Sequence, residues 1–366
     1  MNRRQFLKNS AGSVALLGFS PVLIGCRDTY YTSADFVEAP KADVHFHYGT
    51  TNDALLNYAH SIRMHLVSVN VDGGEDVDEQ LDIVLKLKKQ HPDKMNFLST
   101  FSSLYFETAD FADRTIARID RCMNLGAKGI KIWKNIGMEL QDRNGKYIMA
   151  DHPAFAPIFA YLEKQGIPLM AHLGEPKDCW LPLEEMVMGK GYYRQNPQYH
   201  MYLHPQMPSH EAHIAAIDHL LVKYPKLKMT GAHIGSLEWN LDEVAKRFDA
   251  HPNFTVDLAA RMPNLYYHAV ESRSKLQSFM IQYQSRIMYG SDMACQKTEQ
   301  NRIEERNKST HQTWLQQWQF MATDEMVTSF FSRQTMPKEV AGIRLPRKVV
   351  DNIFYNNTIR VFGKPT

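Results

Sequence analysis

Histidine and aspartate side chains stand at the ends of short apolar runs in this chain, where they can act together on a metal ion. His45 and His47 are separated by one residue within the first run. Later runs end in His172, His233 and Asp292. Imidazole nitrogens and carboxylate oxygens are the ligands that zinc and similar divalent ions take in proteins. A single histidine on an apolar run is usually structural, whereas this set indicates one joint site.

The chemistry that such a site supports is the activation of water. A bound divalent ion lowers the pKa of water from about 15.7 to near 7, and a catalytic site leaves one coordination position open for it. A carboxylate such as Asp292 can accept the proton as the water attacks its target. The residue types therefore indicate metal-assisted hydrolysis or a related reaction.

Eight short apolar runs alternate with longer amphipathic stretches, and these elements must position the site. The predicted strands are Ala42–His47, Leu66–Asn70, Asn96–Phe101, Gly129–Trp133, Ile167–His172, Leu227–His233, Asn253–Leu258 and Arg286–Asp292. The predicted helices include Asp76–Gln90, Ala109–Leu125, Ala154–Gln165, Ser209–Tyr224 and Asn240–Ala250. Alternating strands and helices predict a parallel sheet. Eight such units predict an α/β fold of the TIM (β/α)8 barrel type, whose active sites lie at the C-terminal ends of the strands.

Strand geometry predicts which side chains share a face. Because successive side chains alternate, we expect Asp43, His45 and His47 on one face of the first strand, opposite Val44 and Phe46. His45 and His47 can then reach one ion from a single strand.

Two regions interrupt the alternation. Leu173–Pro208 is a long insertion after the fifth strand, and Cys295–Arg347 follows the eighth. Long loops inside a domain are often lids or binding segments. Lys348–Gly363 is predicted to be a helix that closes the barrel. We expect one domain over residues 42–366.

Several local motifs occur in the order of the strands. They are His-Phe-His at 45–47, Ala-His-Leu-Gly-Glu at 171–175, Gly-Ala-His-Ile-Gly at 231–235 and Tyr-Gly-Ser-Asp at 289–292. A closing segment, Asp351–Asn357 followed by Arg360–Gly363, completes the pattern. This ordered set resembles the amidohydrolase superfamily, and is most similar to its amidohydrolase-related branch of hydrolases, lactonases and non-oxidative decarboxylases.

The resemblance implies a role for each matched residue. The implied metal ligands are His45, His47, His172 and Asp292. Asp292 and His233 are the implied catalytic residues, with His233 polarising the substrate or shuttling a proton in a one-metal site. In two-metal members a carbamylated lysine bridges the ions, so Lys131 is either a bridge or a substrate-binding or structural residue. We expect Zn²⁺, with one ion favoured over two.

Three functions are compatible with these residues. The leading hypothesis is a metal-dependent hydrolase of a small-molecule amide, lactone or ester bond. A metal-dependent non-oxidative decarboxylase is the alternative within the same superfamily. A non-catalytic binding lipoprotein is the third, and the intact set of His45, His47, His172, His233 and Asp292 argues against it.

Further residues are candidates for binding the substrate. Glu175 can accept a hydrogen bond, and Arg261 can hold an anionic group unless it pairs structurally with Asp257. In the insertion, Trp180, Tyr192 and Tyr193 are candidates for an apolar wall. His200 and His204 are four residues apart, as in a helical metal pair, but no third ligand is evident, so we interpret both as non-ligands.

The first 26 residues are typical of an export signal. Arg3 and Arg4 precede an apolar stretch at 11–25, which resembles a twin-arginine signal. Leu-Ile-Gly-Cys, ending at Cys26, resembles the lipobox of bacterial lipoproteins, whose cysteine carries lipid. We expect residues 1–25 to be a signal and 26–41 a tether, which anchors the protein to a membrane facing the periplasm or the cell surface. A short hydrophobic helix with an incidental cysteine is the alternative.

Charge and cysteine content exclude other classes. The chain has 42 Lys and Arg residues against 40 Asp and Glu residues, so it lacks the excess of positive charge that is typical of proteins that bind nucleic acid. Four cysteines are too few for a disulfide scaffold. Cys122 is predicted to be buried, and Cys179 and Cys295 are expected to be thiols in preference to a disulfide. The expected partner is a small-molecule substrate, and a homo-oligomer is left open.

Overall fold

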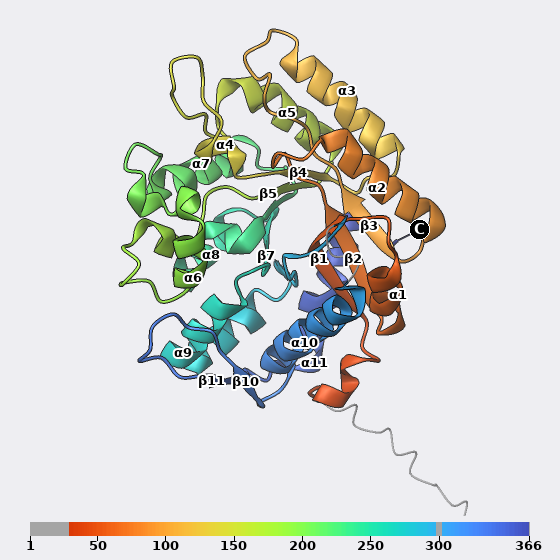
Figure 1. The fold of residues 1–366 in the computed structure, drawn as a ribbon, viewed down its shortest axis with the longest axis vertical. Coiled ribbons are helices and arrows are strands. Elements are labelled where there is room, and N and C mark those ends of the chain that lie inside the picture. Colours follow the sequence, from red (N-terminus) through yellow and green to blue (C-terminus); the bar gives the residue numbers. More distant parts are fainter. Residues whose placement is uncertain (1–28, 298–301, 366) are drawn as a thin grey trace, which may run out of the picture.

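Eight parallel strands form the centre of the computed structural model, which describes residues 29–297 and 302–365 (Figure 1). They are β1 (Lys41–Gly49), β2 (Met64–Val69), β3 (Met95–Leu98), β4 (Ile130–Ile132), β5 (Leu169–Ala171), β6 (Met229–Gly231), β7 (Phe254–Asp257) and β8 (Ile287–Met288). Each of the eight predicted strands is therefore present, most of them shorter than expected. The predicted export signal and Cys26 lie outside the described residues.

Backbone hydrogen bonds join the strands into a ring. One sheet contains the barrel strands in the order β3-β2-β1, followed by a short strand at 293–296, and the other has the order β4-β5-β6-β7-β8. Between β3 and β4, the Lys131 N–H donates to the Ser99 oxygen at 2.7 Å. Between β8 and β1, the Val44 N–H donates to the Tyr289 oxygen at 3.0 Å. The predicted TIM barrel is confirmed.

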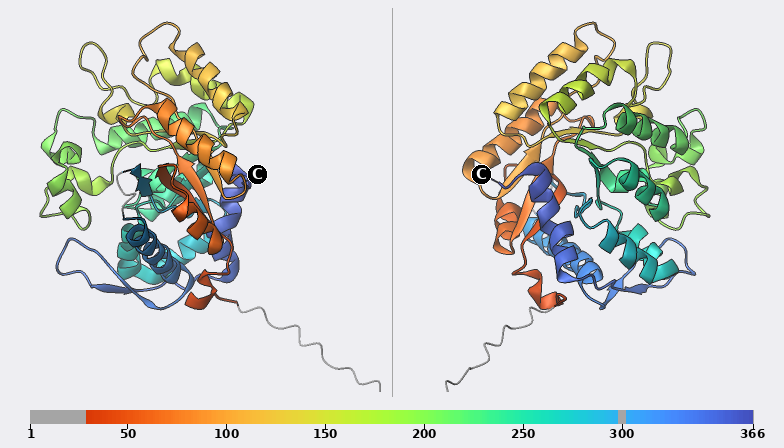
Figure 2. Two further views of the ribbon diagram at one scale, coloured as in Figure 1. Left: turned by 45° about the vertical axis from the view of Figure 1, so that its right-hand side comes forward. Right: turned by 180° about the vertical axis from the view of Figure 1, so that it is seen from behind.

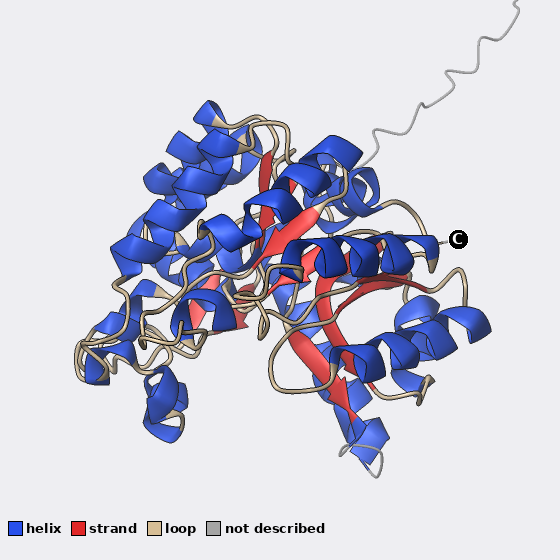
Figure 3. Ribbon diagram, turned by 90° about the horizontal axis from the view of Figure 1, so that it is seen from above, coloured by secondary structure: helices blue, strands red, loops and turns tan. Residues whose placement is uncertain are grey.

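Helices surround the strands, as Figure 3 shows. They include α1 (Ala54–Ser61), α2 (Val77–Gln90), α3 (Phe111–Asn124), α5 (Ala156–Gln165), α7 (His210–Lys223), α8 (Leu241–Ala250) and α9 (Met262–Gln282). Polar side chains start several of them. Asp76 accepts the N–H groups of residues 78 and 79 at the start of α2, and Ser209 and Asn240 cap α7 and α8 in the same way. The five predicted helices are confirmed within two residues at each end.

Two apolar cores lie on the two sides of the barrel wall. The larger core packs helices against the outside of the strands. The smaller one fills the barrel and includes Val44, Val67, Met170 and Met288. Phe362, from the final helix, belongs to this inner core. The barrel is therefore a packed core and not a channel.

The two predicted interruptions are present, and further short segments outside the regular barrel follow β4 and β6 and precede β1. The insertion after β5 contains η3 (Lys177–Trp180), α6 (Lys190–Gln195), η4 (Pro197–Tyr199) and η5 (Met201–Leu203). The short helices outside the insertion are η1 (Ser33–Phe36) before the barrel, α4 (Asn135–Met138) and η2 (Pro153–Phe155) after β4, and η6 (Ala232–Ser236) after β6. After the eighth strand come β9 (Met293–Gln296), α10 (Ile303–Ala322) and a hairpin of β10 (Met326–Thr328) and β11 (Glu339–Ala341). The closing helix is continuous through α11 (Arg347–Asp351), a π-helical turn (Asn352–Asn356) and α12 (Asn357–Phe362), and it is seen from behind in Figure 2.

The helices within the described residues include none that is both long enough and apolar enough to cross a membrane.

The expected alternation of side chains along β1 is wrong. The pairing of β1 with β2 shifts between Asp43 and Phe46, where three steps along β1 match two along β2. Such a bulge places an extra residue in one strand and reverses the alternation beyond it. Val44 and His45 therefore both point into the barrel, while Asp43 contacts Trp314 outside the strand ring.

The eighth strand also differs from its expected form. It breaks after Met288 and resumes as β9, which pairs with residues 46–49 of β1. Asp292 stands at this break with φ of 63°, a left-handed conformation.

Among the described residues, Cys122, Cys179 and Cys295 are buried thiols, and Cys179 is not joined to Cys295. The expectation for these residues is confirmed.

Candidate metal centre

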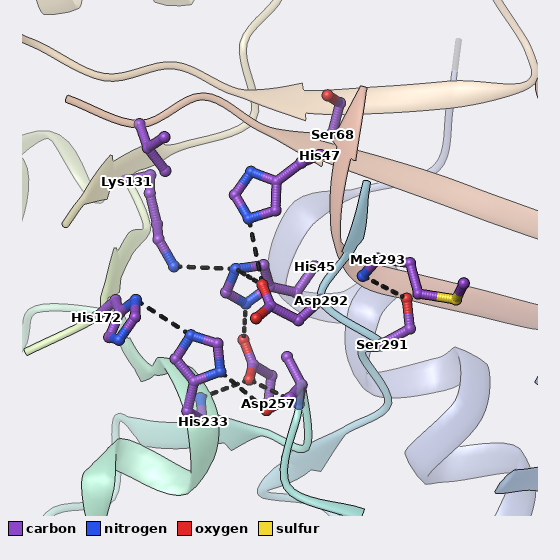
Figure 4. A network of polar contacts seen from close by, with 12 residues as sticks. His45, His47, Ser68, Lys131, His172, His233, Asp257, Ser291, Asp292 and Met293 are labelled. Atoms are coloured by element: carbon purple, nitrogen blue, oxygen red, sulfur yellow. Dashed lines mark hydrogen bonds and ion pairs between the residues drawn. The ribbon is translucent and has the colours of Figure 1, made fainter. Parts of the chain in front are cut away.

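Three potential ligand atoms converge at the C-terminal mouth of the barrel (Figure 4). Oδ1 of Asp292 lies 3.3 Å from Nε2 of His45 and 3.2 Å from Nε2 of His47. The His45 side chain is buried, whereas the side chains of His47 and Asp292 are 23% and 29% exposed. The site therefore combines a buried ligand with two that reach solvent.

A hydrogen bond to Nδ1 of His45 determines which of the two ring nitrogens carries the lone pair. Nδ1 of His45 lies 2.9 Å from Oδ2 of Asp257. Burial raises the pKa of Asp257, but the interaction and hydrogen bond with His45 outweigh this and bring the pKa to about 2. Burial lowers the pKa of His45, which keeps its ring neutral. Because an ionised carboxylate only accepts hydrogen bonds, Nδ1–H of His45 is the donor. Nε2 therefore presents its lone pair to the centre of the site.

The same reasoning applies to His233 and His172. Nδ1 of His233 lies 2.8 Å from the Ala259 carbonyl oxygen, which can only accept, so Nδ1–H donates. Nε2 of His233 is then the acceptor of the 3.1 Å bond from Nδ1 of His172. This leaves Nε2 of His172 as a lone pair, and this buried atom has no hydrogen-bond partner. Burial holds the pKa of both rings well below the usual range of histidine, so both are neutral.

Strained backbone presents two of these side chains. His233 and Ile234 have φ of 59° and 60°, and Asp292 has φ of 63°. Left-handed conformations cost a non-glycine residue about 1–2 kcal/mol, and they cluster at functional sites. The strained turns after β6 and β8 therefore lower the stability of the fold, and they direct His233 and Asp292 into the barrel mouth.

Lys131 lies on β4 and reaches the same centre. Its Nζ is 3.3 Å from Nε2 of His45, and the residue is fully buried. Burial lowers the pKa of Lys131 to about 8. The structure thus brings Lys131 to the ligand His45, although Lys131 is absent from the lining of the pocket that leads to the centre.

A pocket of about 320 Å³ leads to the centre. His172, His233 and Asp292 line its inner end. Tyr192 and Tyr193 line it from the insertion, as predicted.

A second segment completes the wall of the pocket. Phe330 lines it from between β10 and β11. Near it, the Ser332 N–H donates to the Val187 oxygen at 2.8 Å, and the Lys190 N–H donates to Ser332 Oγ at 3.1 Å. The strand-5 insertion and the β10–β11 hairpin therefore meet beside the pocket.

Charged groups in the pocket differ in how well they are paired. Lys134 and Glu175 form a buried ion pair, and Tyr193 donates to Glu175 at 3.3 Å. Arg261 is buried, and its Nε has no hydrogen-bond partner and lies 4.0 Å from Glu238. Glu175 and Arg261 thus both line the pocket, but only the charge of Glu175 is paired and hydrogen-bonded within the protein.

The structure assigns Asp257 differently from the sequence prediction. Asp257 does not pair with Arg261; it accepts from His45 and, through Oδ1, from the backbone N–H of His233 at 2.7 Å. Sequence reasoning missed it as a site residue, although its position at the end of the seventh strand was a usable signal.

Other predicted residues lie away from the ligands. The Trp180 ring packs on the rings of His210 and His213, at centroid distances of 5.3 and 5.9 Å, and it is absent from the pocket lining. His200 and His204 donate to backbone carbonyls of the insertion, which agrees with their interpretation as non-ligands.

The chemistry of these donors fits a divalent metal ion. The lone pair of His45 faces an anionic Asp292 oxygen at 3.3 Å, an arrangement that calls for positive charge beside it, and in this structure Nζ of Lys131 lies 3.3 Å from the same nitrogen. Beside His233, Nε2 of His172 is a buried acceptor without a donor, although it lies outside the group formed by His45, His47 and Asp292. Two imidazole nitrogens and a carboxylate are typical zinc ligands. In contrast, the nearby group of His45, His233 and Asp257 is already satisfied by mutual and backbone hydrogen bonds.

Comparisons with known proteins agree with this fold. A family model described as Amidohydrolase matches residues 21–364. A crystal structure of 2,6-dihydroxybenzoate decarboxylase with 2,6-dihydroxybenzoate is similar in fold, at 14% identity and a TM-score of 0.51, over 88% of this chain and 99% of that one. An amidohydrolase II matches at 15% identity and 0.48, over 88% and 100%. A probable 2-pyrone-4,6-dicarboxylic acid hydrolase from Acinetobacter baumannii matches at 13% and 0.46, over 88% and 99%. No curated protein matches the chain.

Proposed function

Since the chain belongs to the amidohydrolase family and is an enzyme of that family, we propose that it hydrolyses an amide, lactone or ester bond of a small molecule with the help of one divalent metal ion. One observation carries this proposal. Oδ1 of Asp292, which lines a substrate-sized pocket, lies within 3.3 Å of both Nε2 of His45 and Nε2 of His47.

The ligand set in this proposal is His45, His47, His172 and Asp292. The ligand atoms of His45, His47 and Asp292 lie within 4.8 Å of one another, whereas His172 lies beside His233, outside this group, and offers a buried Nε2 without a partner. Zn²⁺ suits these donors. We favour a single ion, because the atoms that would hold a second one are committed to hydrogen bonds among His45, Asp257 and His233.

The reaction needs a base, an electrophile and a fixed substrate. A divalent ion supplies Lewis acidity, which brings the pKa of water to near 7. Burial raises the pKa of Asp292, but the neighbouring His233, His45 and His47 outweigh it and hold the pKa well below the usual range, so Asp292 is ionised and can accept a proton. His233 is neutral, is fixed by Ala259 and lines the pocket; its Nε2, which accepts from His172 in this structure, is the nitrogen that would bond to the substrate or pass on a proton.

The pocket favours a substrate with an apolar body and an anionic group. Tyr192, Tyr193 and Phe330 supply an apolar wall. Arg261 supplies a buried guanidinium that its protein neighbours leave incompletely paired. A carboxylate on the substrate would complete its hydrogen bonds.

Metal analysis combined with product analysis tests the proposal. We expect purified protein to contain one ion per chain, and a screen of lactones, esters, amides and aromatic acids to yield products of water addition. Release of carbon dioxide without net addition of water would replace the hydrolase with the decarboxylase. A protein that binds no divalent ion would refute the metal-dependent mechanism.

We also propose that the enzyme is an exported lipoprotein anchored through Cys26. The residues that support this are Arg3, Arg4 and the lipobox-like sequence before Cys26. In the native bacterial host, Cys26→Ser should release the protein from the membrane fraction. Membrane anchoring that survives this substitution would contradict the proposal.

A further inference from the structure

The carboxylate of Asp43 lies behind the proposed metal ligands and does not line the pocket. Asp43 is fully buried at the start of the β1 bulge. Its Oδ1 accepts the backbone N–H of Ser291 at 2.9 Å and that of His45 at 3.2 Å. One oxygen thus holds a ligand residue of β1 and the residue that directly precedes the ligand Asp292.

The other oxygen of Asp43 is held from outside the barrel. Nε1–H of Trp314 donates to Oδ2 at 2.9 Å. Trp314 is fully buried on α10 and also packs near the ring of Phe46, with centroids 6.3 Å apart. A helix that follows the eighth strand therefore reaches the back of the metal centre through this one bond.

The two ligand segments are also in direct contact with each other. The Asp292 N–H donates to the His45 oxygen at 2.9 Å. A Cβ at Gly290 would lie 3.0 Å from Cβ of His45, so glycine permits this close approach without a shift of the neighbouring strand. Asp43 closes this arrangement, because it bonds to both segments at once.

Burial of the Asp43 carboxylate lowers the stability of the fold, so this residue does more than fill space in the core. A buried carboxylate destabilises a fold unless hydrogen bonds compensate it, and an apolar residue of similar size often serves stability equally well. The three N–H groups that Asp43 accepts lie at the bulge, the strand break and α10. What the carboxylate adds is a fixed placement of these three segments.

We propose that Asp43, held by Trp314, is a positioning residue that sets the placement of His45 relative to Asp292. This inference rests on the proposed function, in which these two residues bind one metal ion. Outer residues of this kind typically change metal affinity or activity about 10- to 100-fold when they are altered.

The test compares four variants. Asp43→Asn keeps one acceptor for the backbone N–H groups but turns its NH₂ toward the indole N–H of Trp314, so two donors face each other. Trp314→Phe removes the indole N–H. The double variant removes this conflict. Trp318→Phe is the matched control, because Trp318 is buried on the same helix but its N–H donates to Thr32 at 3.4 Å.

The first readout is Zn²⁺ titration of metal-free protein, with circular dichroism to confirm folding. We expect a dissociation constant about 10- to 100-fold higher for Asp43→Asn, a smaller increase for Trp314→Phe, and partial recovery in the double variant. Trp318→Phe should bind Zn²⁺ as the wild type does. If Asp43→Asn does not fold, the comparison of Trp314→Phe with Trp318→Phe decides.

A second readout does not need metal. Histidine ¹⁵N NMR of the metal-free protein reports the Nδ1–H of His45 that bonds to Asp257. We expect this signal to shift in Asp43→Asn and Trp314→Phe and to stay in Trp318→Phe. Wild-type protein that binds no zinc would contradict the proposed function, while the NMR comparison still decides the positioning role. Unchanged affinity and spectra in folded Asp43→Asn, or equal losses in the Trp318→Phe control, would overturn the inference.

Discussion

His45 on β1 and Asp257 on β7 face each other with Nδ1 2.9 Å from Oδ2, although the eighth strand lies between their strands. This contact fixes the proton of His45 on Nδ1 and frees Nε2 for a metal ion. The same carboxylate accepts the backbone N–H of His233. Asp257 therefore orients one ligand and one catalytic candidate at once.

Asp257→Asn should weaken metal binding while the fold persists. The amide offers an NH₂ group in place of one carboxylate oxygen, so His45 is no longer held with its proton on Nδ1. We expect the affinity for Zn²⁺ to fall about 10- to 100-fold, as for other groups that orient a ligand. Titration of metal-free protein measures this, and an unchanged affinity would show that the His45 tautomer does not depend on Asp257.

Substitution of two similar histidines should have different effects. His45→Ala removes a ligand, so metal and activity should be lost together. His233→Ala should retain one ion per chain and lose about 10²- to 10⁴-fold in rate, the usual value of positioned proton transfer. Metal analysis with kinetics separates the two. Two ions in the wild type and one in His233→Ala would instead establish a two-metal site with Lys131 as its bridge.

Arg261→Gln should raise KM for anionic substrates. A hydrogen bond to a charged group contributes about 1.5–3 kcal/mol, which corresponds to roughly a 10- to 100-fold change in KM. A neutral analogue of the same substrate should be affected far less. Arg273→Gln is the matched control, since its Nε donates to the Gly342 carbonyl away from the pocket. Equal effects on charged and neutral substrates would argue against an anion-binding role.

Lys41→Met should destabilise the barrel without an effect on the pocket. Nζ of Lys41 is buried and donates to the carbonyl oxygens of Phe36, Ala39 (2.6 Å) and Ile62 (2.9 Å). Leaving a buried acceptor unpaired costs about 1–3 kcal/mol, so we expect a loss on the order of 3 kcal/mol in the free energy of unfolding. Denaturant titration measures it, with exposed Lys164→Met as a control that should stay near the wild type.

His213 should make stability depend on pH. Burial lowers its pKa to about 4, against roughly 6.5 in an unfolded chain. Between these values the unfolded state binds more protons, so stability falls as pH drops from about 6.5 to 4. The shift corresponds to a loss on the order of 3 kcal/mol. In His213→Asn this part of the pH dependence should be absent from unfolding curves, and an unaltered slope would place its origin elsewhere.

Periodicity and local motifs determined the alternation of strands and helices, and with it the barrel. Helix starts were readable because Asp76, Ser209 and Asn240 are capping residues whose effect is local. The ligand candidates His45, His172 and Asp292 were readable because parallel strands bring their C-terminal ends to one rim.

Tertiary structure alone decided the remaining features of the site. The bulge in β1 reversed the expected side of Asp43, because strand register depends on hydrogen bonds to a neighbouring strand and not on the sequence period. Asp257 bonds to His45 and not to Arg261, and Trp314 bonds to Asp43, which lies 271 positions away in the sequence. Such contacts join residues that are remote along the chain, and only packing in three dimensions sets the distances between them.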